Sequence, residues 1–328
     1  MNRTVTVRSL TEKPLVAKSS IRFIKRAFAL LTLTASALLG GNAQASTYTW
    51  NSSSGGTWST NTNWSPATVP TFVAGDTFDL SQLNITANET STMSAAITLG
   101  NINIGDTNNT NTWTLATGGF LTLNSGGSGA ATITQVAGSA GDTISGAYSV
   151  ASNLNLVNNS TTNGTLTISG LGTINASNLT LTQSGTSSTG IVALSGGLSF
   201  NSASGTTFAT SGTTAAKTQI GGITFASGTS AMTLSGSAFT LTGGITNSST
   251  TNLETINNNL TLSNTSFTFT TAAGGLTLNG NISTGTGING NLTLGSGAGT
   301  TILAGTNSII STASFGGVAA LTRLRAIR

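Results

Sequence analysis

The sequence predicts an all-β chain folded as a parallel β-helix, that is, a β-solenoid. Three observations predict it: short apolar–polar–apolar triplets recur along the chain, many triplets follow Gly-Gly or Asn, and only 5% of the 328 residues are charged. Average globular domains contain about 25% charged residues, so this composition indicates a repeat or fibrous architecture. Disordered chains combine low hydrophobicity with high net charge, whereas 37% of this chain is apolar.

The first element is an export leader. A basic stretch ending at Lys25-Arg26 precedes an apolar run at 27–39, and Ala43-Gln44-Ala45 supplies an A-x-A cleavage pattern. The apolar run is too short for a bilayer-spanning helix, which needs about 20 residues. We therefore predict a secretory signal peptide over residues 1–45, cleaved after Ala45, rather than a membrane anchor.

The charge balance changes once the leader is set aside. Seven of the 11 basic residues lie in the first 26 positions, and residues 46–328 keep four basic against six acidic residues. The mature chain therefore has no basic patch for a phosphate backbone, and we expect no nucleic-acid partner. Cysteine and histidine are absent, which removes disulfides, thiolate nucleophiles and imidazole proton transfer.

The triplets are short strands with one buried face. Alternation with period two places both apolar members of a triplet on one face and the polar member on the other. Gly and Asn, which tolerate the backbone angles of sharp corners, come directly before most of them. The triplets are Leu121–Leu123, Leu154–Leu156, Leu166–Ile168, Leu179–Leu181, Leu198–Phe200, Ile223–Phe225, Leu260–Leu262, Leu276–Leu278 and Leu292–Leu294.

Such strands cannot bury a face alone, but stacked coils bury it and pair the backbones. A β-sandwich is the alternative, although its hairpins favour strand spacings of about 8–12 residues and larger core side chains. We expect coils of about 20 residues, which places roughly nine between 118 and 303. The run Asn257–Asn259 is interpreted either as an amide ladder between coils or as a plain turn.

The segment 46–95 differs from the rest because it carries Trp50, Trp58 and Trp64. We predict an N-terminal cap that covers the open end of the solenoid, since uncovered strand edges invite association. The alternative is an aromatic platform in which the three tryptophans contact carbohydrate. The predicted divisions are therefore the signal peptide at 1–45, the cap at 46–95, solenoid repeats at 96–317 and an atypical basic tail at 318–328.

A series of short motifs follows a fixed order along the chain: Trp50-Asn51, Gly56–Ser59, Asn63-Trp64, Pro70, Gly75–Phe78, Asn111–Leu115, Gly119–Gly127 and Asn153–Leu156. This order resembles proteins with autotransporter-associated β-strand repeats, and the resemblance covers most of positions 46–300. It implies an exported right-handed β-helix, displayed or released at the outer membrane, with adhesive or matrix roles and no catalytic residues.

The tail departs from that pattern. It places three arginines in the last six residues, with neither a series of ten-residue alternating strands nor a hydrophobic anchor. We interpret it as the end of a truncated or frameshifted reading frame, and we expect no outer-membrane β-barrel within this chain.

Titratable chemistry is sparse after the leader. Asp76 and Asp79 are the only close pair, in a segment better explained as a turn leading into a strand, so a polysaccharide-degrading enzyme is only an alternative. The segment 138–144 resembles half of a calcium-binding nonapeptide, but working sites need tandem copies. We therefore predict no catalytic residue, cofactor or metal. The carboxylates available are Asp76, Asp79, Glu89, Asp106, Asp142 and Glu254.

Outward Thr-x-Thr pairs raise a further alternative, a surface that binds ice or another crystal. They occur at 165/167, 180/182, 240/242 and 268/270, at intervals too irregular for pairs on consecutive coils. The preferred hypothesis is an exported, non-enzymatic structural or adhesive passenger module at the bacterial surface or outside the cell. Its expected partners are the secretory machinery and an extracellular polysaccharide or a host or matrix surface; polysaccharide binding by a β-helix remains an alternative.

Overall fold

The structure is a computed structural model. It describes residues 45–118, 121–162, 164–175, 180–186, 190–201, 206–210, 218–285, 291–294, 297–306 and 313–315. The predicted signal peptide, apart from Ala45, and the basic tail at 318–328 lie outside these ranges. Among the helices of the described ranges, none combines the length and the apolar content that crossing a membrane requires.

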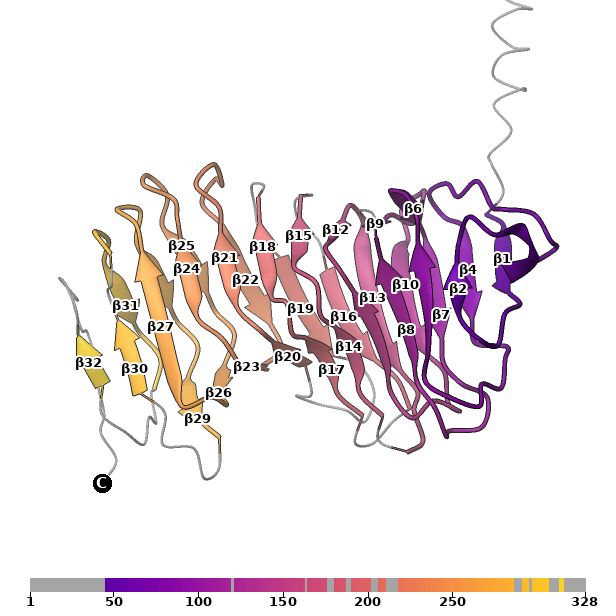
Figure 1. Cartoon of the computed structure of the whole chain (residues 1–328). Coiled ribbons are helices and arrows are strands. Elements are labelled where there is room, and N and C mark those ends of the chain that lie inside the picture. The colour runs from indigo at the N-terminus through magenta and orange to yellow at the C-terminus, as the bar shows by residue number, and fades with distance from the viewer. Residues whose placement is uncertain are drawn as a thin grey trace, which may run out of the picture. The chain divides into compact units, whose positions relative to one another are not determined.

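The chain from Ala45 onward winds through three parallel sheets, here called A, B and C (Figure 1). Each coil adds one strand to each sheet, so strands that are neighbours in a sheet are usually three apart in chain order. Every pairing in the described residues is parallel except that of β1 with β3. The predicted parallel β-solenoid is therefore confirmed, and an antiparallel sandwich is excluded.

Sheet A has twelve strands and reaches furthest toward the N-terminus. In sheet order they are β3 (Trp64–Ser65), β1 (Thr47–Trp50), β4 (Thr77–Leu80), β7 (Asn101–Ile104), β10 (Ala130–Gln135), β13 (Asn153–Asn158), β16 (Thr180–Ser184), β19 (Thr206–Thr210), β22 (Thr233–Gly236), β25 (Glu254–Ile256), β28 (Leu276–Leu278) and β31 (Thr301–Leu303).

Sheet B has ten strands. They are β2 (Gly56–Thr57), β5 (Glu89–Met93), β8 (Trp113–Thr117), β11 (Asp142–Ser145), β14 (Leu166–Ile168), β17 (Val192–Leu194), β20 (Thr218–Ile220), β23 (Phe239–Leu241), β26 (Leu260–Leu262) and β29 (Ile282–Thr284).

Sheet C also has ten strands. They are β6 (Ile97–Leu99), β9 (Leu121–Leu123), β12 (Tyr148–Val150), β15 (Gly172–Ile174), β18 (Leu198–Phe200), β21 (Ile223–Phe225), β24 (Ile245–Asn247), β27 (Ser266–Thr271), β30 (Asn291–Leu294) and β32 (Ala313–Phe315). A single 3-10 turn, η1 (Asn61–Asn63), interrupts the strands of the described residues.

The length of a coil differs from the expected 20 residues. Ser149 contacts Thr122 of the previous coil, 27 residues earlier, and Ser283 contacts Thr261, 22 residues earlier. Each coil holds three strands and three corners, and their summed length exceeds 20 residues. Sheet C accordingly places eight strands, β9 to β30, in the region expected to hold nine coils.

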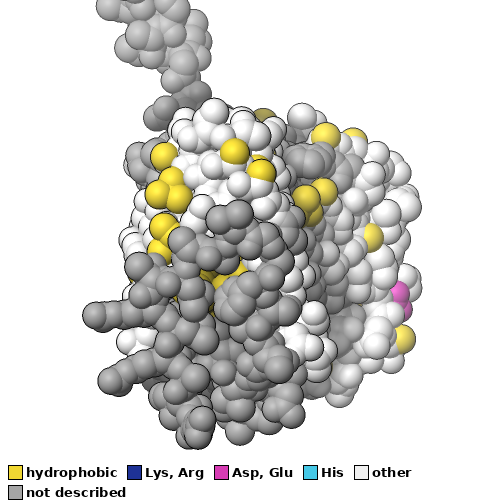
Figure 2. Space-filling model, turned by 90° about the vertical axis from the view of Figure 1, so that its left-hand side faces the viewer, with side chains coloured by type: hydrophobic (Ala, Val, Ile, Leu, Met, Phe, Trp, Pro, Cys, Tyr) yellow, Lys and Arg dark blue, Asp and Glu magenta, His cyan; other side chains and the backbone are white. Residues whose placement is uncertain are grey.

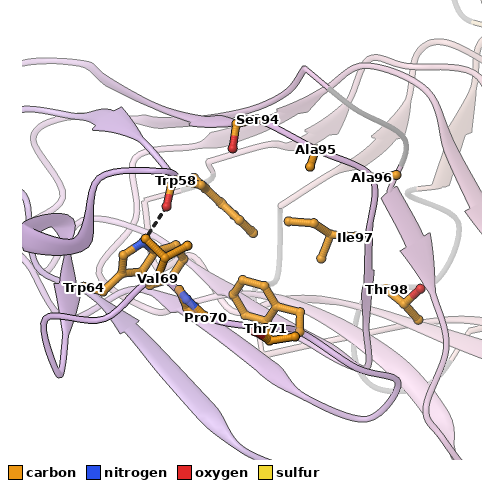
Figure 3. A pocket seen from close by; sticks show the side chains of 11 residues that line it. Trp58, Trp64, Val69, Pro70, Thr71, Ser94, Ala95, Ala96, Ile97 and Thr98 are labelled. Atoms are coloured by element: carbon orange, nitrogen blue, oxygen red, sulfur yellow. Dashed lines mark hydrogen bonds between the residues drawn. The ribbon is translucent and has the colours of Figure 1, made fainter.

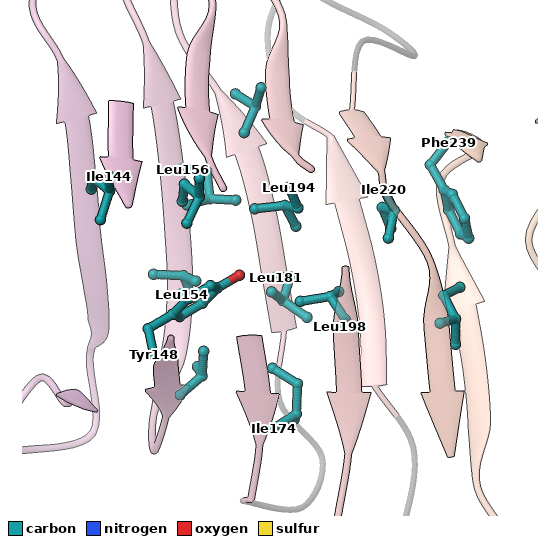
Figure 4. Close-up of a cluster of buried hydrophobic side chains, with 14 of the residues drawn as sticks. Ile144, Tyr148, Leu154, Leu156, Ile174, Leu181, Leu194, Leu198, Ile220 and Phe239 are labelled. Atoms are coloured by element: carbon teal, nitrogen blue, oxygen red, sulfur yellow. The ribbon is translucent and has the colours of Figure 1, made fainter. Parts of the chain in front are cut away.

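The triplets form strands as predicted, with their apolar members inside. Leu121 and Leu123 are fully buried while Thr122 between them is half-exposed. Equivalent residues of successive coils stack on one another, which gives continuous columns of Leu, Ile and Phe in the core (Figure 4). Of the predicted triplet residues, only Leu179 lies outside the described residues.

One core position breaks the triplet pattern for a steric reason. Gly172 starts β15 where its neighbours in the column carry Tyr148 on one side and Leu198 on the other. A Cβ at Gly172 would collide with the ring and hydroxyl of Tyr148. The glycine therefore makes room for the largest side chain in that column.

The glycine-rich corners before sheet C are required by close backbone stacking. A Cβ added at Gly243 would collide with the carbonyl oxygen of Gly221 in the previous coil. Backbone atoms cannot move aside as the end of a flexible side chain can, so a side chain at Gly243 would push two coils apart. The Gly-Gly signal in the sequence thus marks a corner where coils touch through their backbones.

The asparagine run bonds to the neighbouring coils, which favours the ladder interpretation over a plain turn. Asn279 Nδ2 donates to Asn257 Oδ1 at 2.8 Å, and the Asn281 amide donates to Asn259 Oδ1 at 2.8 Å. Asn258 is buried and donates from Nδ2 to the Ser237 carbonyl, 21 residues earlier, at 2.8 Å. All three asparagines therefore link one coil to the next.

Candidate functional site

The three tryptophans of the segment 46–95, here called the cap, form a small aromatic core. Trp64 packs with its ring centroid 5.1 Å from that of Trp50 and 5.2 Å from that of Trp58, both nearly edge-to-face. Phe78 lies 4.5 Å from Trp58, centroid to centroid. Edge-to-face contacts of this kind stabilise aromatic clusters beyond their burial alone.

The indole N–H groups are also used inside the cap. Trp58 Nε1 donates to Ser91 Oγ at 2.8 Å, and Trp64 Nε1 donates to the Trp58 carbonyl at 2.9 Å. Trp50, Trp58 and Trp64 are each at most 2% exposed. The structure thus brings the three predicted carbohydrate-contact residues together as core residues, with little ring surface facing solvent.

A pocket of about 350 Å³ opens beside two of these tryptophans (Figure 3). Trp58 and Trp64 line it, and Trp50 does not. One side is formed by residues 69–72, which include the half-buried Phe72, and the other by residues 94–98 at the start of sheet C. All lining residues are uncharged: Trp58, Trp64, Val69, Pro70, Thr71, Phe72, Ser94, Ala95, Ala96, Ile97 and Thr98.

The sequence did not indicate this pocket. Ser94-Ala95-Ala96 carries no motif, and only the folded chain places it opposite the segment that follows Trp64. The feature of the sequence that comes closest to indicating the pocket is Val69 beside Pro70, because a large apolar residue in a loop stands out in a Ser/Thr/Asn-rich chain. In the structure, 43% of the Val69 surface is exposed.

Asp76 and Asp79 are structural carboxylates. Asp76 accepts hydrogen bonds from the backbone amides of Ser46, at 2.8 Å, and Val73, at 2.9 Å. Asp79 accepts from the Ser81 amide and from Gln82 Nε2, both at 3.0 Å. Their oxygens are therefore occupied by separate donors at the ends of β4, which agrees with the predicted turn leading into a strand.

Asp106 organises the corner that follows β7. It is fully buried and accepts hydrogen bonds from the backbone amides of Ile85, Thr110 and Asn111 at 3.1–3.3 Å. Carboxylates that bind several backbone N–H groups hold tight corners without a metal.

Asp142, in the segment that resembles half of a calcium nonapeptide, is likewise 2% exposed. It accepts from the Trp113 amide at 2.9 Å and from the Ser139 hydroxyl. Burial raises its pKa to about 6, and the negative charge of Asp106 adds to the rise, while the two hydrogen bonds oppose it. Within the described residues no three His, Cys, Asp or Glu side chains gather as metal ligands.

Glu254, at the start of β25, is the third buried carboxylate of the solenoid strands and corners. It accepts from the Met232 amide at 2.7 Å and the Thr229 hydroxyl at 3.3 Å. Burial raises its pKa, and the two hydrogen bonds counteract that rise. Each acidic residue after position 45 thus sits in a structural position, apart from Glu89, which is half-buried.

The outer surface of the described coils is consequently almost uncharged. All Lys and Arg residues lie outside the described ranges, and five of the six acidic residues are buried. Figure 2 shows the result on one face, where the described atoms are mostly white, the colour of uncharged polar side chains and backbone, and acidic side chains are scarce. Hydroxyls and amides, rather than charges, are the groups that this surface offers.

The Thr-x-Thr pairs do not share a face. The pairs 165/167 and 240/242 include outward residues of sheet B, 180/182 lies on sheet A, and 268/270 lies on sheet C. Sheet C nonetheless carries a column of hydroxyl residues at the outward positions of consecutive strands, which the triplets did not reveal; Ser149 in this column is buried, at 6% exposure. The column consists of Thr98, Thr122, Ser149, Thr173, Ser199, Thr224, Thr246 and Thr270.

Comparison with known proteins identified no relative: no family model, no curated protein and no solved structure matches the chain. The fold and the residues described above therefore carry the functional argument by themselves.

Proposed function

We propose that this chain is an exported structural or adhesive passenger module without catalytic activity, of the type built from autotransporter-associated β-strand repeats. The leader pattern at 1–45 supports export, and the motif order from Trp50 onward supports the family. The proposed location is the bacterial surface or the extracellular space. The proposed partners are the secretory machinery during export and then an uncharged polysaccharide or a matrix surface.

The observation that carries this proposal is that the carboxylates are buried inside the solenoid, whereas its outer surface carries uncharged polar groups. The buried carboxylates hold corners through backbone hydrogen bonds, and the outside presents repeated hydroxyl and amide groups. A general acid or nucleophile has to reach its substrate within hydrogen-bonding distance. A long uncharged surface instead suits multivalent contact, in which many weak contacts sum to a strong one.

Export and adhesion have separate tests. The full chain, expressed with its leader in a Gram-negative host, should appear outside the cytoplasm with a new N-terminus at Ser46, as measured by fractionation and N-terminal sequencing. Purified mature chain coupled to beads should retain the beads on polysaccharide-coated surfaces in high salt, since the contacts are not ionic. Retention of an uncleaved chain in the cytoplasm contradicts export, and release of reducing ends from polysaccharide contradicts the absence of catalysis.

One observation favours a second function, binding to ice or another crystal. The hydroxyl column of sheet C repeats at the spacing of parallel strands, about 4.8 Å, over eight consecutive strands from β6 to β27. Thermal hysteresis of the purified mature chain at high concentration would support this function. If the chain shows no thermal hysteresis and does adhere to polysaccharide, the adhesive function is supported and ice binding is contradicted.

A further inference from the structure

The N-terminal end of sheet C stops earlier than those of the other two sheets. β4, β5 and β6 follow one another in one coil; in the coil before it, sheet A continues with β1 and sheet B with β2, but sheet C has no described strand. In the described residues β6 has one neighbouring strand, β9. Directly after β6 the Gly100 amide donates to the Asp76 carbonyl of the preceding coil at 2.8 Å, so the part of this edge without a described neighbouring strand is β6 itself.

The backbone groups that face this empty position can be assigned. The Asn124 amide donates to the Leu99 carbonyl at 2.7 Å, so the backbone of Leu99 points toward β9. Successive residues of a strand in a parallel sheet direct their N–H and C=O groups to opposite neighbours. Thr98 accordingly directs its backbone groups away from β9, and no backbone hydrogen bond joins the described residues 94–98 to 69–72.

The pocket lies along this same edge. Residues 94–98 form one of its sides, and Trp58 and Trp64 project toward it from the cap (Figure 3). Ala95 and Ala96 are exposed, and Ile97 is only half-buried, whereas Leu121, the next residue in its column, is fully buried. The first apolar residue of the column thus lacks the cover that a preceding coil gives to the others.

We propose that this edge binds an extended peptide segment of a partner protein, which adds to sheet C as a strand parallel to β6. The backbone of Thr98 pairs with the peptide, and apolar side chains enter the pocket, as in other cases of strand addition to a free sheet edge. Because every lining residue is uncharged, the inserted side chains are apolar. The peptide therefore has the apolar–polar–apolar pattern of the chain's own strands.

A single strand fits this site better than the end of a second solenoid. The N-terminal ends of sheets A and B are extended by β1, β2 and β3, and the aromatic core of the cap lies among them. A flat end of another copy would meet these elements before it reached β6. The edge that remains accessible is three residues long in β6, the usual strand length of sheet C.

The binding test uses the full mature chain and the pentapeptide Gly-Leu-Thr-Leu-Asn, the sequence of residues 275–279. Calorimetric titration should give saturable binding with one site per chain. Val69→Asp should weaken binding about tenfold or more, because the peptide would bury an unpaired charge. The matched control is Val73→Asp, since Val73 is equally exposed, at 44% against 43%, but does not line the pocket. Equal weakening by both substitutions, or no binding by the unmodified chain, would overturn the proposal.

Strand addition itself is tested by modified peptides. In parallel pairing the N–H groups of the two leucines face β6, and the N–H of the threonine faces away. N-methylation of both leucines should abolish binding, whereas N-methylation of the threonine should leave most of it. The reverse order overturns the parallel arrangement. Concentration-dependent self-association that Val69→Asp removes and the pentapeptide does not compete with would assign the edge to a second copy instead of a partner.

Discussion

The interior of the cap and the interior of the solenoid coils are filled by different kinds of side chain. In the cap, the interior is filled with large rings in mostly edge-to-face contact, those of Trp50, Trp58, Trp64 and Phe78. In the coils, columns of Leu and Ile stack, and glycine corners let backbones touch. An interior coil has neighbours above and below, so small side chains in register suffice. The end of the stack has a neighbour on one side only, and bulky rings replace the missing coil.

The largest expected effect is at the centre of the cap. Trp64 is 2% exposed and contacts Trp50 and Trp58, so Trp64→Ala should lower the free energy of unfolding by about 3–5 kcal/mol. Urea denaturation followed by circular dichroism measures it. Val73→Ala, at an exposed position of the same segment, is the control and should cost under about 0.5 kcal/mol. A loss below about 1 kcal/mol for Trp64→Ala would show that the rings are not a core.

The corresponding effect in the coils should come from backbone contact rather than side-chain volume. Gly243→Ala places a Cβ against the Gly221 carbonyl and should cost about 3 kcal/mol, the upper end of the range for overpacking. The matched control is Gly228→Ala, where a Cβ meets nothing within 4 Å. If the two variants unfold at the same urea concentration, close stacking does not explain the Gly-Gly corners.

A smaller effect is expected where Tyr148 and Gly172 of neighbouring coils occupy the same space in the core. Gly172→Leu alone should destabilise the chain because its side chain collides with Tyr148, whereas the double variant Gly172→Leu/Tyr148→Leu restores two ordinary members of the column. We expect a favourable coupling of about 2 kcal/mol in a double-mutant cycle of unfolding free energies. Additive losses would mean that the two residues do not compete for the same space.

The smallest effect concerns pH and lies in the coils next to the cap. The pKa of Asp142 is about 6 in the folded chain, against about 3.9 in an unfolded one. The carboxyl therefore contributes stability that is fully present below about pH 4 and is lost as the pH rises through 6; about 2 kcal/mol of it is lost between about pH 4.5 and 7.5.

Unfolding free energies at pH 4.5 and 7.5 measure this contribution. Asp142→Asn should reduce the difference between the two pH values relative to the unsubstituted chain, while the part due to Glu254, whose pKa is raised in the same direction, should remain. An unchanged pH profile in the variant would contradict the assignment to Asp142.

Much of the fold followed from local patterns. The alternation in triplets such as Leu276–Leu278 correctly assigned inward and outward residues, and Gly or Asn correctly marked corners. The length of a coil did not follow, because neighbouring triplets such as Leu154–Leu156 and Leu166–Ile168 belong to different sheets of one coil. Nothing in a three-residue strand distinguishes the next strand of a coil from the strand stacked on it.

The candidate site was less accessible to sequence reasoning. The three tryptophans were correctly grouped in a cap, but the pocket also needs residues 94–98, which have no distinctive composition. The hydroxyl column of sheet C was missed for a related reason. Its members lie 22–27 residues apart and become a column only when the coils are in register.

The sequence by itself determined which residues face inward and where the chain turns, because side-chain alternation and corner geometry are local properties of the backbone. It also determined that charged residues are scarce after position 45. The tertiary structure alone decided which strands stack, that the carboxylates are buried at corners, and that β6 keeps a free edge beside a pocket. These depend on contacts between residues in different coils, and the varying corner lengths set the register of those contacts.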